Sequence, residues 1–289
     1  MSLQEALADV VAGREVAAAR LEDAFGEIAD GGASPVAMAA LLAALATRGE
    51  TPAELAAVAR ALRARGRTVP LADPRTVDTC GTGGDGAGTF NISTAAALVA
   101  AGAGVPVAKH GNRAASSQAG SFDVLEALGV HIELSVEASA RVLRETGFGA
   151  FFARRAHPAM RHLAPIRAEL GVRTVMNLMG PLLNPVGARR QLLGVYAASK
   201  VEPMARVLVV HGEDGLDEIT TTGITHAAWL EAGAVRRLTL DPSELGMARA
   251  DPAALRGGDA RHNAARMLEI LEGAPGPRRD IVLANAGAA

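Results

Sequence analysis

The chain has 289 residues, of which 49% are hydrophobic and 21% charged, a composition typical of folded globular proteins and unlike that of disordered ones. Its 29 Lys and Arg residues against 31 Asp and Glu give a formal charge of −2, so nonspecific nucleic-acid binding, which needs a basic excess, is not expected. The single cysteine, Cys80, excludes an internal disulfide bond and fits a cytoplasmic location.

Residues 1–68 are predicted to be helical. Ser-Pro at 34–35 and Thr-Pro-Ala-Glu at 51–54 are helix-start signals, the second with the spacing of a capping box, and apolar residues recur between them at helical spacing. Because acidic residues begin at Glu5, the N-terminus does not fit a signal peptide. The longest weakly polar run, 92–108, is interrupted by glycine and proline, so no membrane span is predicted. We interpret 1–68 as a packing or dimerisation module.

Short apolar runs alternate with helical stretches from Arg75 onward, which predicts an α/β domain with a largely parallel sheet. The expected strands are TVDTC (76–80), VPVAK (105–109), VHIEL (130–134), FGAFFA (148–153), QLLGVYA (191–197), VLVVHG (207–212) and VRRLTL (235–240). Ligands of such sheets lie at the carboxyl ends of the strands, so we expect the functional residues there.

A glycine-rich stretch, DTCGTGGDGAGTFNIST (78–94), follows the first of these strands and leads into the helical stretch STAAALVAAG (93–102). Glycine lets backbone N–H groups converge on an anion, and the N-terminus of the next helix favours negative charge. The stretch matches neither the P-loop pattern nor a clean GxGxxG fingerprint. Taken alone, it leaves two interpretations open, a phosphate-binding loop and a plain flexible loop.

The next predicted strand ends in a second polar loop, KHGNRAASSQAGSFD (109–123). It supplies two cations, Lys109 and Arg113, together with amide, imidazole and hydroxyl groups. Because the carboxyl ends of neighbouring parallel strands meet at one edge of a sheet, the two loops are expected to form two walls of one anion pocket. This favours a ligand such as a diphosphate over the alternative of a solvated basic turn.

Five segments together resemble the anthranilate phosphoribosyltransferase family: GTGGD, NIST, KHGNRAASSQAGSFDVLEALG, HPAMRHLAPIRAELGVRTVMNLMGPLLNP (157–185) and VVHGEDGLDE (209–218). The likeness extends over nearly the whole chain. It implies a nucleoside phosphorylase/phosphoribosyltransferase-like fold, in which a small discontinuous helical domain joins a large α/β domain with a mainly parallel sheet. The helical domain is expected at 1–68, joined by helices within about 159–190, and the α/β domain, which binds phosphoribosyl diphosphate, at 73–289. The resemblance also implies a homodimer through the helical domain.

The same resemblance implies transfer of the phosphoribosyl group from 5-phosphoribosyl 1-diphosphate to the amine of anthranilate, with release of diphosphate, in tryptophan biosynthesis. Two Mg²⁺ ions are implied, one bound by Ser93 and one by Asp217 with Glu218. Hard oxygen ligands suit Mg²⁺. The ions would neutralise the negative charge of diphosphate and so make it a better leaving group. With no obvious nucleophile pair in the sequence, we expect direct displacement governed by positioning.

The remaining site residues also follow from the resemblance. The residues implied to hold the phosphoribosyl diphosphate are Gly81, Gly84, Asp85, Thr89, Asn91, Ile92, Ser93 and Thr94. The residues implied to close over it are Lys109, His110, Gly111, Asn112, Arg113, Ala114, Ala115, Ser116, Ser117 and Ser121. Asn112 and Arg167 match residues that hold anthranilate, with His110 and His157 along its path. Lys109 and Arg167 are the expected catalytic residues; a cap at a helix start remains the alternative for His157.

Three features depart from the family pattern. The link between the strands at 191–197 and 207–212 is shorter than expected, so we expect either missing residues or an extended link, with distorted geometry between about Ala205 and Val209. The chain ends soon after Asp280, which we interpret as the cap of a final helix; the α/β domain is therefore expected to be truncated and to expose an apolar face. Phe122 stands where the family usually has a small residue, and is expected to alter loop closure.

Two other functions are considered. A pyrimidine nucleoside phosphorylase would share the fold and the anion pocket, but the loops KHGNR and HPAMRHLAPIR argue against it. A non-catalytic homologue that binds nucleic acid would conflict with the near-neutral charge and with the presence of Ser93, Asp217 and Glu218. We therefore expect small-molecule substrates and neither a nucleic-acid nor a membrane partner.

Overall fold

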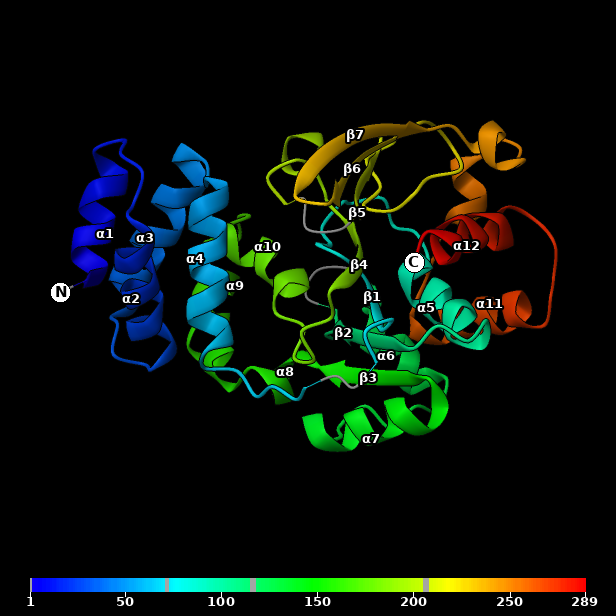
Figure 1. The fold of residues 1–289 in the computed structure, drawn as a ribbon, viewed down its shortest axis with the longest axis horizontal. Helices are drawn as coiled ribbons and strands as arrows, with labels where there is room; N and C mark the ends of the chain where they lie inside the picture. Colours follow the sequence, from blue (N-terminus) through cyan, green and yellow to red (C-terminus); the bar gives the residue numbers. More distant parts are fainter. Residues whose placement is uncertain (1, 71–72, 115–117, 205–207) are drawn as a thin grey trace.

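Four helices at the N-terminus form most of the smaller part of the structure (Figure 1). The computed structural model describes residues 2–70, 73–114, 118–204 and 208–289. The four helices are α1 (Ser2–Val11), α2 (Ala18–Ala29), α3 (Pro35–Arg48) and α4 (Pro52–Arg63).

Both predicted helix starts in this region are confirmed. The Ser34 side chain accepts a hydrogen bond from the Ala37 N–H at 3.2 Å, at the start of α3. At the start of α4, the Thr51 hydroxyl accepts from the Glu54 N–H at 3.2 Å, and the Glu54 carboxylate accepts from the Thr51 N–H at 3.0 Å. Glu54 is buried and also accepts from the Val16 N–H at 2.9 Å, so this capping box ties α4 to the segment before α2.

Helices from the middle of the chain complete the smaller part. They are a 3-10 turn (Pro158–His162), α9 (Ala164–Leu170) and α10 (Val175–Leu182). The short helix α8 (Ala153–Ala156) precedes them and packs in the larger part, where Ala156 shares a core with Phe151 of β3. Ile166 of α9 and Met179 of α10 belong to the same apolar core as Leu42 of α3 and Leu62 of α4. The helical part is therefore built from two separate stretches of the chain, since neither stretch alone encloses this core.

The larger part is built on a seven-stranded sheet in the order β3-β2-β1-β4-β5-β6-β7 (Figure 1). The first five strands are parallel: β1 (Val77–Gly81), β2 (Val107–Gly111), β3 (Phe148–Phe152), β4 (Arg190–Gly194) and β5 (Leu208–Gly212). The last two, β6 (Thr225–Glu231) and β7 (Ala234–Leu240), are antiparallel. The strand order changes direction at β1, which pairs with both β2 and β4, and ligand crevices of α/β sheets form at such switch points.

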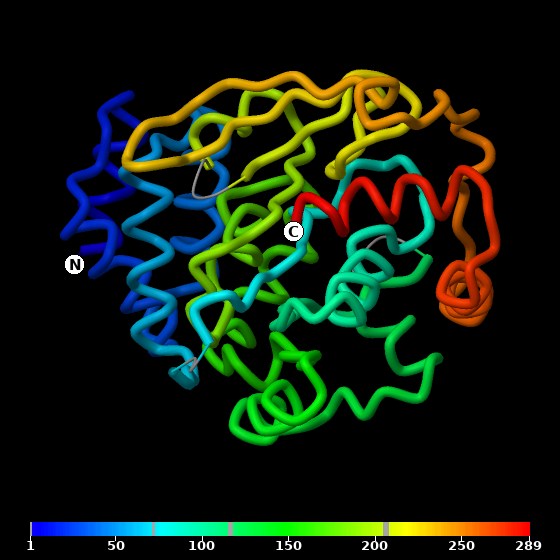
Figure 2. The backbone as a smooth tube through the Cα atoms, turned by 45° about the vertical axis from the view of Figure 1, so that its right-hand side comes forward, coloured from blue at the N-terminus to red at the C-terminus, as the bar shows by residue number. Residues whose placement is uncertain are grey.

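Helices cover the two faces of the sheet differently. The helices of the larger part are α5 (Ile92–Gly102), α6 (Ser121–Ala127), α7 (Val136–Thr146), α11 (Ala260–Leu271) and α12 (Pro277–Ala288), with 3-10 turns at Ala198–Lys200, Pro242–Leu245 and Pro252–Leu255. Val77 and Val107 pack against α5, whereas Cys80, Leu193 and Val209 belong to the core of the helical part. Figure 2 shows the same division, with the N-terminal helices in blue and the C-terminal helices in orange and red on opposite sides of the strands.

The predicted fold class is confirmed, but one predicted strand was wrong and one strand was missed. Residues 130–134 form turns and coil rather than a strand. Ile132 is buried in a cluster with Phe122 and Phe152 beside the edge strand β3. The alternating pattern therefore reflects the burial of one side chain in a loop rather than a strand. Strand β6 was not predicted, because its sequence, THAAWLE, does not show a clear alternation of apolar and polar residues.

The shortened link between β4 and β5 contains only a 3-10 turn and bends over its described residues, 195–204, and no α-helix. Most of the segment for which we predicted distorted geometry, 205–207, lies outside the described residues, so that part stays a prediction. Leu208 and Val209 themselves belong to β5 and pair with β4.

The C-terminal helix begins earlier than predicted. Gly276 precedes the first residue of α12, Pro277, and Asp280 lies in the first turn of the helix rather than capping it. Three leucines of the last two helices, Leu268, Leu271 and Leu283, are 49%, 46% and 42% exposed. The truncation of the α/β domain and its apolar face stay predictions. Among the described residues, no helix combines the length and apolar character that crossing a bilayer requires.

Candidate active site

Two glycines at the ends of neighbouring strands lie against an acidic turn. Gly81 ends β1 and Gly194 ends β4, and the two residues pair directly. A Cβ atom on Gly81 would lie 2.2 Å from Oδ2 of Asp217, and one on Gly194 would lie 1.5 Å from the Asp217 carbonyl oxygen. A Cβ would therefore displace the Asp217 side chain at Gly81 and collide with the Asp217 backbone at Gly194, because the turn crosses directly over the carboxyl ends of the central strands. Gly194 was not among the predicted site residues.

The acidic pair Asp217–Glu218 is hydrogen-bonded to the predicted anion loop. The Gly83 N–H donates to Oδ2 of Asp217 at 2.7 Å, and the Ser93 N–H at the start of α5 donates to Oε1 of Glu218 at 3.0 Å. Gly83 and Gly84 have φ angles of 66° and 73°, which glycine adopts without strain. The structure thus joins the first predicted loop, the α5 N-terminus and the acidic pair in one site.

Both carboxyl groups of the pair are buried. Burial raises the pKa of Asp217 well above its usual range, and the adjacent Glu218 raises it further. Burial also raises the pKa of Glu218 to about 7, although the ammonium of Lys109 opposes that shift. Two buried carboxyl groups without a full complement of positive charge form a set of hard oxygen donors, which fits Mg²⁺.

Lys109 reaches the same site from β2. Its side chain is buried, and Nζ donates to the Thr79 carbonyl oxygen at 2.6 Å. The Thr79 hydroxyl in turn donates to the Ser93 carbonyl oxygen at 2.9 Å, so Lys109 and Ser93 lie on the same side of the sheet edge. Burial lowers the pKa of Lys109, while Asp78 and Glu218 act in the opposite direction. Both predicted loops therefore contact Thr79 of β1, through Lys109 and Ser93.

The second loop is folded back on α6. The guanidinium of Arg113 pairs with Asp123 at 3.1 Å and with both oxygens of Glu126 at 2.7 and 2.8 Å. The Asp123 carboxylate also accepts from the N–H groups of Ala114 and Gly120, both at 2.8 Å. Arg113 is therefore neutralised within its own loop rather than presented to an anion.

Other predicted residues of this loop lie close by. The Ser121 hydroxyl is 3.4 Å from the Asn112 carbonyl oxygen, and a Cβ on Gly111 would lie 2.6 Å from that hydroxyl. Phe122 is fully buried and stacks on Phe152 with ring centroids 5.2 Å apart, so it is a core residue at the base of the loop. The predicted residues Ala115, Ser116 and Ser117 lie outside the described part of the chain.

The remaining predicted residues of the first loop differ in exposure. Asn91 donates to the Ala119 carbonyl oxygen at 3.2 Å and accepts from Asn263 at 2.9 Å, which links α5, the second loop and α11. Ile92 is buried in the apolar core. The Thr94 hydroxyl is also buried and has no hydrogen-bond partner among the described residues. The Asp85 carboxylate accepts from the Ala87 N–H at 3.3 Å. The backbone of Thr89 forms an isolated antiparallel β-bridge with that of Arg256.

Arg167 approaches from the helical part. It lies on α9, is partly buried, and has no carboxylate partner among the described residues. Burial lowers the pKa of this guanidinium, and no acidic group counteracts the shift. A desolvated guanidinium without a carboxylate partner is suited to a carboxylate ligand.

Two predicted histidines form a buried pair between the two parts. The rings of His110 and His157 meet edge to face with centroids 5.1 Å apart, and Nδ1 of His110 lies 3.0 Å from the Gly180 carbonyl oxygen. Burial lowers the pKa of His110 to about 3 and that of His157 to about 4, so both rings are neutral at neutral pH. The side chain of His157 makes no capping hydrogen bond at the 3-10 turn that follows it.

One contact between the two parts was not predicted. Arg173, which precedes α10, donates to the Gly84 carbonyl oxygen and lies 4.4 Å from the centroid of the Tyr196 ring. A single arginine in a polar loop carries no distinguishing pattern in the sequence. The contact places a guanidinium next to the glycine loop.

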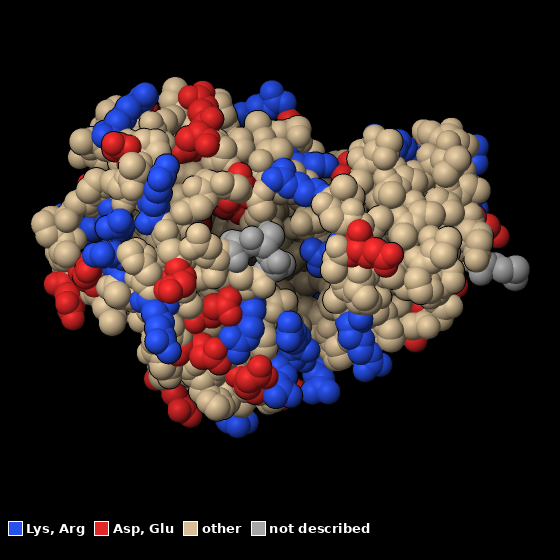
Figure 3. All heavy atoms as spheres, turned by 180° about the vertical axis from the view of Figure 1, so that it is seen from behind, with Lys and Arg blue, Asp and Glu red and all other residues tan. Residues whose placement is uncertain are grey.

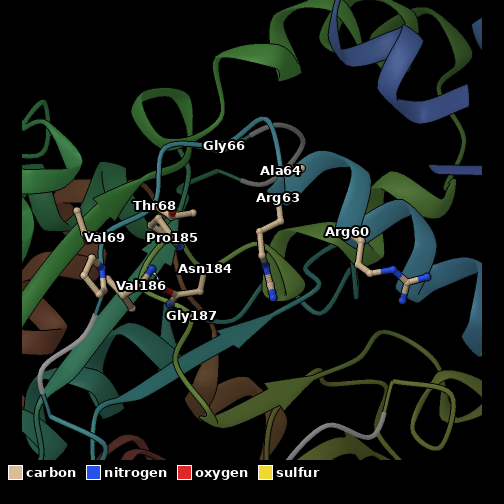
Figure 4. A pocket seen from close by; sticks show the side chains of 11 residues that line it. Arg60, Arg63, Ala64, Gly66, Thr68, Val69, Asn184, Pro185, Val186 and Gly187 are labelled. Atoms are coloured by element: carbon tan, nitrogen blue, oxygen red, sulfur yellow. Dashed lines mark hydrogen bonds between the residues drawn. The ribbon is translucent and has the colours of Figure 1, made fainter. Parts of the chain in front are cut away.

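The molecular surface is hollowed between the helical and α/β parts, with Lys and Arg side chains on both sides of the hollow (Figure 3). A separate pocket of about 610 Å³ lies where the chain crosses between the parts, after α4 and after α10 (Figure 4). Arg63 and Asn184 line it, and Nδ2 of Asn184 donates to the Ala108 carbonyl oxygen at 2.8 Å. None of the predicted site residues lines this second pocket, so we assign the function to the sheet edge instead.

Comparisons with known proteins agree with this assignment. Residues 4–66 match the helical bundle domain of a glycosyl transferase family, and residues 73–289 match the α/β domain of that family. The anthranilate phosphoribosyltransferase of Rubrobacter xylanophilus is 54% identical over 99% of this chain and 86% of its own length.

Solved structures are similar as well. The crystal structure of anthranilate phosphoribosyltransferase from Thermus thermophilus has a TM-score of 0.92 and 47% identity, over 98% of this chain and 87% of that one. The enzyme from Saccharomyces cerevisiae in complex with PRPP and Mg has a TM-score of 0.89 and 27% identity, over 98% of this chain and 86% of that one. The yeast enzyme is also known in complex with 4-fluoroanthranilate. This chain belongs to the anthranilate phosphoribosyltransferase family.

Proposed function

We propose that the protein transfers the phosphoribosyl group of 5-phosphoribosyl 1-diphosphate to the amine of anthranilate and releases diphosphate, as a step of tryptophan biosynthesis. The observation that carries the proposal is the single site formed by the glycine loop, the α5 N-terminus, Lys109 and the acidic pair. The relatives that match over most of the chain are named for this activity, and a yeast relative binds both PRPP and an analogue of anthranilate.

The first loop and Lys109 hold the sugar donor in this proposal. The N-terminus of α5 and its Ser93 and Thr94 hydroxyls attract phosphate oxygens through the helix dipole and hydrogen bonds. The buried Thr94 hydroxyl, which lacks a partner among the described residues, is available for this role. The Lys109 ammonium supplies positive charge at the same wall.

The protein uses Mg²⁺, which Asp217 and Glu218 hold through carboxylate oxygens. When bound, the ion offsets the negative charge of the departing diphosphate. We further propose a second Mg²⁺ at Ser93. Counting the Mn²⁺ ions bound per chain in the presence of the sugar donor tests this number. We expect two ions per chain, and a single bound ion would contradict the second site.

Arg167 orients anthranilate by pairing with its carboxylate as a two-pronged donor. Asn112 and the neutral rings of His110 and His157 line the approach, and Nε2 of His110 has no hydrogen-bond partner among the described residues. The amine nitrogen then forms a bond to C1 of the ribose as the bond from C1 to the diphosphate oxygen breaks. Diphosphate leaves with the electron pair of that bond, and the nitrogen releases one proton to solvent. Since no side chain forms a covalent intermediate, the rate comes from positioning and charge stabilisation.

The assembly and the domain division are also proposals. We assign the helical domain to 1–68 with the helices within 159–190, in line with their shared core, and the α/β domain to the rest of 73–289. We propose a homodimer through this domain on the basis of the family resemblance. Light scattering at micromolar concentration should give twice the mass of 29.5 kDa, and a monomer would refute the dimer. We also propose a cytoplasmic location, in keeping with the proposed role in tryptophan biosynthesis.

Anthranilate fluorescence provides the direct test. Protein, anthranilate, sugar donor and Mg²⁺ together should remove the fluorescence of anthranilate, and omission of the donor or addition of EDTA should prevent it. Unchanged fluorescence together with phosphorolysis of thymidine would identify a nucleoside phosphorylase instead. Salt-sensitive DNA binding without turnover would identify a binding homologue.

A further inference from the structure

The acidic pair sits between two apolar anchors that both pack against α12. Leu216 precedes the pair and shares an apolar core with Ile281 and Val282 of that helix. Ile219 follows the pair and shares a different core with Ala284 of the same helix. Leu216 and Ile219 are 3% and 2% exposed. The turn that carries Asp217 and Glu218 is therefore held from both sides by one helix that lies about 60 residues later in the chain.

A buried amide adds polar contacts to this packing. Asn285 of α12 is 0% exposed. Its Oδ1 accepts from the Ile219 N–H at 3.0 Å, and its Nδ2 donates to the Ile219 carbonyl oxygen at 2.8 Å and to the Ile281 carbonyl oxygen at 2.9 Å. One side chain thus satisfies both backbone groups of the residue next to Glu218, as a neighbouring strand would do.

The same helix also supports the partner of Glu218. Helix α12 packs against α5, whose first turn supplies the Ser93 N–H that donates to Glu218. On the other side of the turn, the Asp214 carboxylate accepts from the Leu216 N–H at 3.2 Å and from the Thr220 hydroxyl at 2.6 Å. The backbone is thus fixed before and after the acidic pair.

We propose that Asn285 is a positioning residue for the metal-binding acidic pair. It holds the Ile219 backbone in place. Asp217 is thereby kept against Gly81 and Gly194, and Glu218 is kept beside Ser93. The inference rests on the proposed function, because it assumes that the pair holds Mg²⁺. Loss of the amide leaves the ligands in the chain but removes their fixed placement, and partners of this kind typically change metal affinity by about 10- to 100-fold.

The test compares the variants Asn285→Leu and Asn285→Ala with the wild-type chain. Leucine has the same branched arrangement of four heavy side-chain atoms as asparagine and removes all three hydrogen bonds. Alanine, which is smaller, controls for the larger volume of leucine. Free Mn²⁺ is measured by electron paramagnetic resonance, with the 289-residue protein and saturating 5-phosphoribosyl 1-diphosphate. Circular dichroism at the same temperature checks that each variant is folded. We expect both variants to raise the Kd for Mn²⁺ by about tenfold or more, with turnover recovering as Mg²⁺ is increased.

Leu143→Ala serves as the control for a general loss of stability. Leu143 is a buried residue of α7, in a core that contains no residue of the acidic turn. This variant should melt at a lower temperature and keep the wild-type Kd for Mn²⁺. Folded Asn285 variants with wild-type Mn²⁺ affinity, or an equal loss of affinity in Leu143→Ala, would overturn the inference alone. Absence of Mn²⁺ binding by the wild-type protein would overturn the proposed function itself.

Discussion

At the ends of β1 and β4, two glycines make room for the turn that carries the acidic pair. The nearest approach is at Gly194, where an added Cβ would lie 1.5 Å from a backbone oxygen. A flexible side chain can move away from such a contact, but the backbone of a turn that α12 holds through Ile219 cannot move freely. The placement of Asp217 is therefore set by the absence of two side chains as well as by hydrogen bonds.

Replacing Gly194 with alanine should reduce kcat/KM for the sugar donor by about 100-fold, because the acidic turn must shift by roughly 1 Å or more. Steady-state kinetics at saturating anthranilate measures this effect. Gly102→Ala is the control: Gly102 lies in α5 with open space around it, and alanine there should stabilise the helix slightly. Near wild-type activity of the Gly194 variant would show that the turn is not fixed by this contact.

Replacing Arg167 with alanine should raise the KM for anthranilate about 10- to 100-fold, since a charge-assisted contact to a carboxylate is lost. The KM for the sugar donor should stay nearly constant, because Arg167 lies on α9 of the helical part and is proposed to contact only anthranilate. Arg144→Ala, on the exposed side of α7, provides the matched arginine control. Unchanged anthranilate kinetics would contradict the assignment of Arg167.

At the scale of single helices and strands, local sequence signals were sufficient to predict two helix caps. They were insufficient where packing against other elements determines the secondary structure. The Ser34 and Thr51 caps were predicted correctly, because each requires only residues within one turn. The run at 130–134 has a strand pattern, yet it lies beside an edge strand and buries only Ile132 deeply. Asp280 resembles a cap, but Pro277 begins the helix one turn earlier.

The capping box of α4 gives a stability prediction at this scale. Thr51→Ala should lower the free energy of unfolding by about 1 kcal/mol, because the Glu54 N–H loses its acceptor. Denaturant titration measures the change, and kcat should be unaffected since Thr51 lies in the helical part. A loss below about 0.3 kcal/mol would mean that water replaces the cap at no cost.

For the whole molecule, the sequence identified the candidate site residues, but it did not predict most of the contacts between them. Both polar loops follow predicted strands, so their position at the sheet edge could be inferred from the alternation of strands and helices. The contacts of Gly194, Arg173 and Asn285 could not, because each joins residues far apart in the chain and none lies in a recognisable motif. The proposed metal-binding role of Asp217 and Glu218 rests on the family resemblance, since an acidic pair alone is common in solvated turns.

The buried histidines between the two parts predict an acid-sensitive fold. The pKa of His157 is lowered from 6.5 to about 4, so the unfolded chain binds more protons than the folded protein between these values. Stability therefore falls as the pH drops from about 6.5 to about 4, by up to about 3 kcal/mol for this group. Denaturant titrations of the wild type and of His157→Asn at about pH 7.5 and about pH 4.5 measure the difference. Equal pH dependence of the two proteins would contradict the buried neutral state.

The central claim is that the glycine loop, Lys109, Ser93 and the acidic pair bind one phosphorylated sugar together with Mg²⁺. A crystal structure of the protein with 5-phosphoribosyl 1-diphosphate and Mg²⁺ tests it most directly. We predict phosphate oxygens at the N-terminus of α5 and beside Lys109, with the ion on Asp217 or Glu218. Sugar density at another surface, with these side chains free of ligand, would contradict the account.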